Sequence, residues 1–104
     1  MIAEYIRYKM PDSAAQEQLI AAYERAARVL QASSHCLGFE LAQCADEPAV
    51  FILRIEWDSA EGHLKGFRTS PEFRTLYQAV APFVPNIEEM RHYNLTDVCW
   101  KREA

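Results

Sequence analysis

Three histidines, His35, His63 and His92, are the side chains of this sequence whose charge can change near neutral pH. His63 stands beside the apolar positions of a helical segment, so its ring should lie at the rim of the gap between that helix and a sheet. Partial loss of solvent there would lower the pKa of the imidazole and favour the neutral form, which accepts a proton. We therefore expect His63 to be the acid–base residue if the chain is an enzyme, and a partly exposed structural histidine otherwise.

Other side chains of the same regions could complete such a site. Tyr77 falls on an apolar helical stripe, where a buried hydroxyl needs a hydrogen-bond partner, and Arg68 could bind an anionic group or pair with Glu72. The expected catalytic residues are His63, Tyr77 and His92, and the expected substrate-binding residues are Trp57, Phe67, Arg68, Phe73 and Tyr93. Core packing is the simpler interpretation of Trp57, Phe67 and Phe73. The three histidines are scattered along the chain without zinc or iron spacing, so no metal ligand is predicted.

The N-terminal part predicts a strand followed by a helix. Alternation of side chains with a two-residue period indicates a strand over residues 2–9, which Pro11 ends. Asp12 or Ser13 should then cap an amphipathic helix of about 19 residues that packs one stripe against a core.

A hairpin should follow, with strands over residues 36–42 and 50–57 joined by a turn at 46–48. Its odd-numbered residues form an apolar face that we expect under the helices: Leu37, Phe39, Leu41, Phe51, Leu53, Ile55 and Trp57. The opposite face is half apolar and would leave more apolar area in water than is usual. We expect it to combine Val50, Ile52, Met90 and Ile2 or Ile6 with Glu40, Arg54 and Glu56.

The C-terminal half predicts a broken helix and a last strand. Asp58-Ser59 should cap the helix, and Ser70-Pro71 should restart it. Residues 82–85 contain two prolines and should be extended, and residues 87–98 should form the strand. The order βαββαβ, with both crossover helices on one face, predicts an α+β, ferredoxin-like fold with a four-stranded antiparallel sheet.

Composition limits the class of protein. With 104 residues, half of them apolar, the chain can form one domain. The net charge is −4 and basic runs are lacking, so neither nucleic acid nor a membrane is an expected partner. The apolar runs are too short for a membrane span and the N-terminus lacks a signal-peptide pattern, which predicts a cytoplasmic protein.

Several stretches together resemble the antibiotic biosynthesis monooxygenase family, in particular a subgroup of it that is found fused to truncated globins. They are Glu4-Tyr5-Ile6-Arg7-Tyr8, residues 57–68 (WDSAEGHLKGFR), Ser70-Pro71-Glu72-Phe73 and Ile87-Glu88-Glu89-Met90-Arg91-His92-Tyr93. The resemblance implies a single domain over residues 1–104, with a core over 2–97 and a tail over 98–104. It also implies a homodimeric α+β barrel in which two sheets pack face to face, where His92 could form a hydrogen bond across the barrel. A second copy would then cover the half-apolar face.

The resemblance further implies a monooxygenase that acts on a small aromatic or polyketide-like substrate without a cofactor. A heme- or tetrapyrrole-binding, or heme-degrading, protein is the alternative. However, the heme-degrading branch needs Asn, Trp and His where this chain has Arg7 or its neighbours, Phe67 and Tyr77. In the quinol-oxidising branch a pair of histidines stands where Phe67 and Glu72 are found here. A third possibility is a non-enzymatic stress module or a module that binds a hydrophobic ligand.

Overall fold

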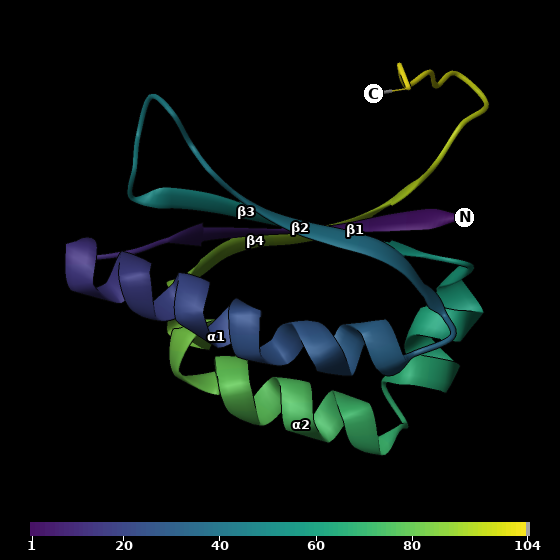
Figure 1. Cartoon of the computed structure of the whole chain (residues 1–104), viewed down its shortest axis with the longest axis horizontal. Helices are drawn as coiled ribbons and strands as arrows, with labels where there is room; N and C mark the ends of the chain where they lie inside the picture. The colour runs from purple at the N-terminus through teal and green to yellow at the C-terminus, as the bar shows by residue number, and fades with distance from the viewer. Residues whose placement is uncertain (104) are drawn as a thin grey trace.

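One antiparallel sheet with helices on a single face makes up the fold. The computed structural model describes residues 1–103. The strands are β1 (Ile2–Lys9), β2 (Cys36–Gln43), β3 (Val50–Trp57) and β4 (Ile87–Asn94), and the helices are α1 (Ser13–Ala32), η1 (Gly62–Phe67), α2 (Pro71–Val80) and η2 (Ala81–Asn86). The sheet has the order β2-β3-β1-β4, and α1 and α2 lie side by side beneath it (Figure 1). The predicted ferredoxin-like α+β fold is confirmed.

Helix α1 begins where the sequence predicts. The side chain of Asp12 accepts the backbone N–H of Ala15 at 2.8 Å, which is the expected N-cap hydrogen bond. The stripe that faces the sheet is rich in alanine, which allows a close approach of the helix backbone: Leu19, Ala22, Tyr23, Ala26 and Leu30. Within residues 1–103, no helix has both the length and the apolar character needed to cross a membrane.

The part of the chain after β3 corrects two predictions. Residues 82–85, expected to be extended, belong to the 3-10 helix η2, because the φ angle that proline fixes also suits a 3-10 turn. The last strand ends at Asn94 rather than at residue 98. Asn94 pairs with Ile2, the first residue of β1, so the residues beyond it have no neighbouring strand to pair with.

The pairing register decides which side chains face the helices. Glu4 lies opposite Ile55 on β3 and opposite His92 on β4. Cross-strand partners share a face of the sheet, so Glu4 and His92 both lie on the helix side. The same register turns Ile2, Ile6 and Met90 towards the helices. The expectation that Met90 and Ile2 or Ile6 belong to the opposite face is therefore wrong.

The face without helices is less apolar than the sequence suggests. Val50 lies on it but is already buried by the chain itself, whereas Ile52 remains partly exposed. Leu37, expected under the helices, lies where the pairing of β2 with β3 shifts between Cys36 and Gly38, and it is 50% exposed. We call the sheet face without helices the open face. Cross-strand pairing assigns to it Ala3, Tyr5, Arg7, Glu40, Ile52, Arg54, Glu56 and Tyr93.

Candidate functional site

A cavity of about 230 Å³ lies between the helix side of the sheet and the segment that runs from η1 to η2. We call it the inner pocket. Its walls are mainly apolar, with side chains from β1, β3, α2 and β4. Of the site residues predicted from sequence, those that line it are Trp57, His63, Phe67, Arg68, Phe73 and Tyr77.

A buried carboxylate belongs to this pocket. Glu4 is 4% exposed, and its Oε1 accepts the indole N–H of Trp57 at 3.2 Å. Burial raises the pKa of Glu4, and the Trp57 hydrogen bond and the positive charges of His92 and Arg68 act in the opposite direction. Sequence reasoning missed Glu4. The signal was a carboxylate at the centre of an otherwise apolar strand face.

The side chains of His63, on η1, and His92, on β4, both lie next to Glu4. Nε2 of His92 lies 3.4 Å from Nε2 of His63 and 3.7 Å from Oε2 of Glu4. Nδ1 of His63 lies 3.7 Å from Oε1 of Glu4, too far for a hydrogen bond. One donor atom from each residue lies within 4.8 Å of the other two, so all three could contact one ion or one water molecule.

The environment of His63 favours its neutral form. The residue is 3% exposed, and its Nδ1 has no hydrogen-bond partner among residues 1–103. Burial lowers the pKa of His63 to about 4, and the charges of His92 and Arg68 act in the same direction. The sequence predicts the direction of this shift. However, the residue lies fully inside the pocket rather than at its rim.

A π turn in η1 places His63 next to the sheet. η1 is a π-helix, in which the N–H of Arg68 bonds to the carbonyl of His63 at 3.1 Å, five residues back. Ser59 Oγ accepts the N–H of Gly62 at 2.8 Å where the segment begins. Such single π turns are frequent at functional sites.

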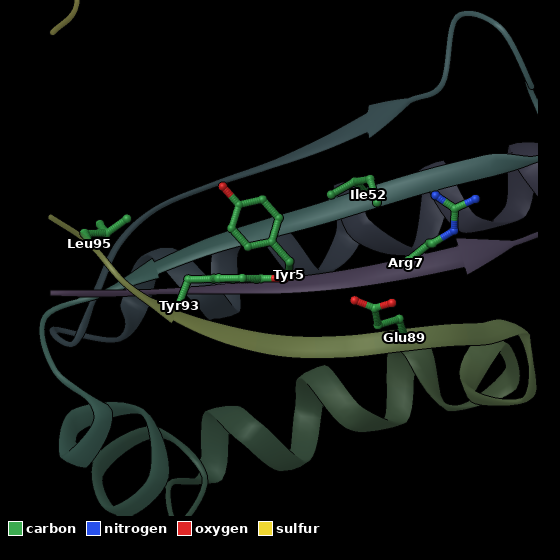
Figure 2. Close-up of a pocket in the computed structure, with 6 residues that line it drawn as sticks. All are labelled: Tyr5, Arg7, Ile52, Glu89, Tyr93 and Leu95. Carbon is green, nitrogen blue, oxygen red and sulfur yellow. The ribbon is translucent and has the colours of Figure 1, made fainter. Parts of the chain in front are cut away.

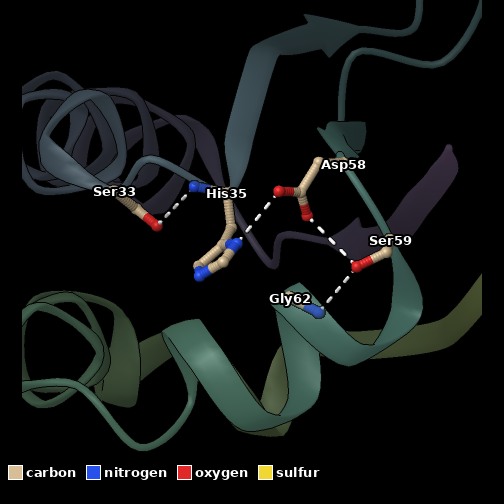
Figure 3. A network of polar contacts seen from close by, with 5 residues as sticks. All are labelled: Ser33, His35, Asp58, Ser59 and Gly62. Atoms are coloured by element: carbon tan, nitrogen blue, oxygen red, sulfur yellow. Dashed lines mark hydrogen bonds and ion pairs between the residues drawn. The ribbon is translucent and has the colours of Figure 1, made fainter.

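His35 supports this segment from outside the pocket. Its Nδ1 lies 3.0 Å from Oδ2 of Asp58, next to Ser59 and Gly62 (Figure 3). A Cβ on Gly66 would lie 2.4 Å from the ring of His35, and one on Gly62 would lie 2.8 Å from it. Only glycine at these two positions lets the ring pack so closely. The hydrogen bond from His35 lowers the pKa of Asp58, with smaller contributions from Ser59.

Aromatic rings continue from the cluster towards the pocket mouth. The ring centroids of Trp57 and His63 are 4.6 Å apart, and those of Trp57 and Phe67 are 4.9 Å apart. Phe73 follows at 5.8 Å from Phe67, and Tyr77 at 6.1 Å from Phe73. Tyr77 is 51% exposed, so its hydroxyl does not need a partner within the protein.

Two tyrosines place polar atoms elsewhere in the pocket. The hydroxyls of Tyr8 and Tyr23 are 2.5 Å apart, and both residues are buried. Tyr8 is four residues from Glu4 on β1, which corresponds to about 13 Å along a strand. No pattern in the sequence indicates that these two hydroxyls meet.

Tyr93 lies apart from the inner pocket. It is on the open face, where its ring packs edge-on against Tyr5 with centroids 5.2 Å apart. Figure 2 shows both beside a separate hollow of about 490 Å³, which is also lined by Arg7, Ile52, Glu89 and Leu95. The period of two along β4 places Tyr93 opposite to His92, so these neighbours cannot serve the same pocket.

Comparisons with known proteins agree with the fold. The profile of the antibiotic biosynthesis monooxygenase family matches residues 1–79, which include Glu4 and His63 but not His92. The protein YczJ of Bacillus subtilis (strain 168), which is uncharacterised, is 26% identical over 80 residues that cover 73% of this chain and 83% of YczJ.

Solved structures show the same architecture. A candidate antibiotic biosynthesis monooxygenase from Bordetella bronchiseptica superimposes with a TM-score of 0.74 at 18% identity, covering 91% of this chain and 96% of that one. Another, from Deinococcus radiodurans, has a TM-score of 0.74 at 13% identity, covering 99% and 100% of the two chains. At these identities the likeness shows the fold alone. The closer resemblance to the globin-fused subgroup stays a prediction.

Proposed function

Because this chain belongs to the antibiotic biosynthesis monooxygenase family, we propose that it oxygenates a small aromatic or polyketide-like compound held in the inner pocket. The observation that carries the proposal is the apolar, aromatic-lined cavity in which the buried Glu4 and His63 lie beside the partly exposed His92. Largely apolar pockets with a few placed polar groups are typical of sites for small organic ligands.

The size of the inner pocket supports a compact substrate. Its volume of about 230 Å³ lies below the range of roughly 300–1,000 Å³ that is typical for drug-sized ligands. A small fused-ring system suits such a cavity better than a tetrapyrrole does. The rings of Trp57, Phe67 and Phe73 offer surfaces for a planar substrate.

The polar group of the pocket supplies a proton acceptor. A phenol or enol of the substrate gives its proton to His63, whose Nδ1 has no protein partner within residues 1–103. The resulting anion donates an electron to dioxygen. One oxygen atom then enters the substrate, and the other leaves as water with two hydrogen atoms of the substrate. This route needs no cofactor, in line with the expectation from sequence. Arg68 at the pocket wall can attract the anion.

The test is oxygen uptake by the purified protein with a panel of dihydroxyarenes and anthrones. Replacing an acid–base group typically lowers the rate by about 10²–10⁴-fold, so His63→Asn should lose most of the uptake seen with the parent. Arg28→Gln, on the exposed side of α1 and outside the inner pocket, is the control and should keep it.

The outcomes separate the alternatives. No uptake with any compound, together with binding of an anthrone to the folded protein, would replace the oxygenase by a ligand-binding module. A stoichiometric shift of the Soret band on titration with hemin would instead favour the tetrapyrrole-binding alternative. Uptake that is unchanged in His63→Asn would remove His63 from the reaction.

A further inference from the structure

The donor atoms of Glu4, His63 and His92 are arranged as metal ligands are. One donor atom each from β1, η1 and β4 lies within 4.8 Å of the other two. The shorter contacts use both ring nitrogens of His63, since Nε2 is 3.4 Å from Nε2 of His92 and Nδ1 is 3.7 Å from Oε1 of Glu4. Donor atoms bound to a tetrahedral zinc ion at about 2.0–2.2 Å lie roughly 3.4 Å from one another. Closing around one ion therefore requires the three donor atoms to move from within 4.8 Å to about 3.4 Å of one another.

The unpartnered nitrogen of His63 points to a ligand. Nδ1 of His63 is buried and has no hydrogen-bond partner in the described residues, and its nearest charged neighbour is Oε1 of Glu4 at 3.7 Å. Leaving such a buried polar atom unpaired costs about 1–3 kcal/mol. An ion between His63 and Glu4 would remove that cost.

The surroundings of Glu4 are those of an oriented ligand. The N–H of Trp57 holds one carboxylate oxygen, and Trp57 is itself completely buried. Hydrogen bonds of this kind fix the direction of metal-binding side chains in many proteins. In the absence of an ion, the same contact only partly compensates the burial of a carboxylate.

We infer that Glu4, His63 and His92 form a binding site for one divalent transition-metal ion. Two imidazoles and one carboxylate are a ligand set of catalytic zinc sites and of non-heme iron(II) sites. Since Glu4 and His63 both line the inner pocket, the remaining coordination positions face that pocket and are open to water or to a substrate oxygen.

Glu4, as a ligand, and Arg68, as a neighbour of the site, have opposite effects on the binding of a cation. The carboxylate of Glu4 supplies a negative charge, and the guanidinium of Arg68 opposes the ion. Arg68 is exposed, so solvent reduces its effect. Arg68→Gln should therefore tighten ion binding slightly without removing a ligand.

The site does not depend on the proposed function, because binding is measured without any substrate. It has a consequence for that function, however. A bound ion uses a lone pair of His63, and loading with Zn²⁺ should then lower oxygen uptake by the route proposed above.

The experiment uses the untagged, metal-free protein. Titration with Co²⁺, followed by visible absorption, and titration with Zn²⁺, followed by calorimetry, should each show one ion per chain. The cobalt spectrum should lack the near-ultraviolet sulfur-to-metal band, because a thiolate ligand from the free cysteines is not part of this site. Glu4→Gln keeps an oxygen that can accept the Trp57 N–H, and His92→Asn changes a partly exposed residue, so both variants should fold. Circular dichroism checks this.

Each variant should weaken binding by more than the roughly 10–100-fold that is typical of losing an outer hydrogen-bond partner of a ligand. Glu24→Gln is the control, because Glu24 is an exposed carboxylate of α1 that lies outside the group. It should bind as the parent does. Failure of the folded parent to bind either ion at about 0.1 mM overturns the inference and leaves a water molecule as the partner of His63. Equal affinity in Glu4→Gln, in His92→Asn and in the parent overturns it as well.

Discussion

Trp57 donates its indole N–H to Oε1 of Glu4 at 3.2 Å, so the largest fully buried side chain of the chain also orients its buried carboxylate. Trp57 also packs against the rings of Phe67 and His63. The core and the candidate site are therefore not separable at this residue.

Replacing Trp57 should separate its packing from its hydrogen bond. Trp57→Ala should lower the free energy of unfolding by about 3–5 kcal/mol, as removal of a buried aromatic ring usually does. Trp57→Phe keeps an aromatic ring but leaves Glu4 without its donor, and should cost less. Urea unfolding followed by circular dichroism measures both. A parental value for Trp57→Ala would mean that the ring does not carry the packing seen here.

The two strands that the sequence predicts with correct ends, residues 2–9 and 50–57, carry a clear two-residue period and are bounded by turn residues. Such patterns are local, and they were sufficient to predict the order of the elements and the fold class. The meeting of Glu4, His63 and His92 depends on two features that no local pattern reveals. One is the register that sets Glu4 opposite His92, and the other is the π turn that brings His63 over the sheet.

The register between strands, which no local pattern reveals, also explains the errors in assigning side chains to the two faces of the sheet. Pairing places the even-numbered residues of β1 on the face of the odd-numbered residues of β3. Ile6 and Met90 were assigned to the open face because the phase of each strand relative to the others was unknown. Tyr93 was grouped with His92 although the two-residue period within one strand already places neighbouring side chains on opposite faces.

The hydroxyl pair of Tyr8 and Tyr23 predicts a non-additive effect on stability. Tyr8→Phe or Tyr23→Phe alone leaves one buried hydroxyl without a partner and should cost about 1–3 kcal/mol. The double variant leaves neither hydroxyl, so it should cost less than the sum of the two single changes. A double-mutant cycle in urea tests this. Strict additivity would contradict a direct hydrogen bond between the two.

The close packing of Gly66 against His35 predicts a sensitive position on η1. Gly66→Ala should lower the melting temperature, because the new Cβ would lie 2.4 Å from the ring of His35. Removing the ring with His35→Ala should relieve the clash, so the double variant should melt higher than the sum of the single effects predicts. Gly38→Ala is the control, since no atom lies within 4 Å of its added Cβ, and it should be neutral or slightly stabilising.

The pair of Asp58 and His35 predicts a dependence of stability on pH. The hydrogen bond from His35 holds the pKa of Asp58 below its ordinary value of 3.8. A carboxyl group with a lowered pKa stabilises the folded state above its ordinary value, and that contribution is lost as the pH falls through the lower pKa of the folded state. The difference in melting temperature between the parent and Asp58→Asn should therefore be present at pH 6 and shrink below about pH 3.8.

The same comparison in a His35→Asn background is the control, because the hydrogen bond is then absent from both proteins. If the difference in melting temperature persists unchanged at low pH, or is also present in the His35→Asn background, the difference has another cause than the pair of Asp58 and His35.

The open face predicts the oligomeric state. It carries Ile52 and the rings of Tyr5 and Tyr93, and the helices of the described residues lie on the other side of the sheet (Figures 1 and 2). Its charges have both signs, with Arg7 and Arg54 beside Glu40, Glu56 and Glu89, so two copies can face each other without a net repulsion. We expect a homodimer in which two sheets pack face to face, burying at least about 800 Å² on each copy.

Light scattering should give twice the 12.0 kDa of the single chain at micromolar concentration. Ile52→Asp places a charge at the centre of the open face and should shift the protein to the mass of one chain, because an unpaired charge is costly in a buried interface. Ile20→Asp makes the same change at a partly exposed position on α1, on the helix side of the sheet, and should leave the mass doubled. A parent that scatters as a single chain would contradict this assembly. A dimer that survives Ile52→Asp but not Ile20→Asp would move the interface to the helices, because the charge disrupts only the surface on which it is buried.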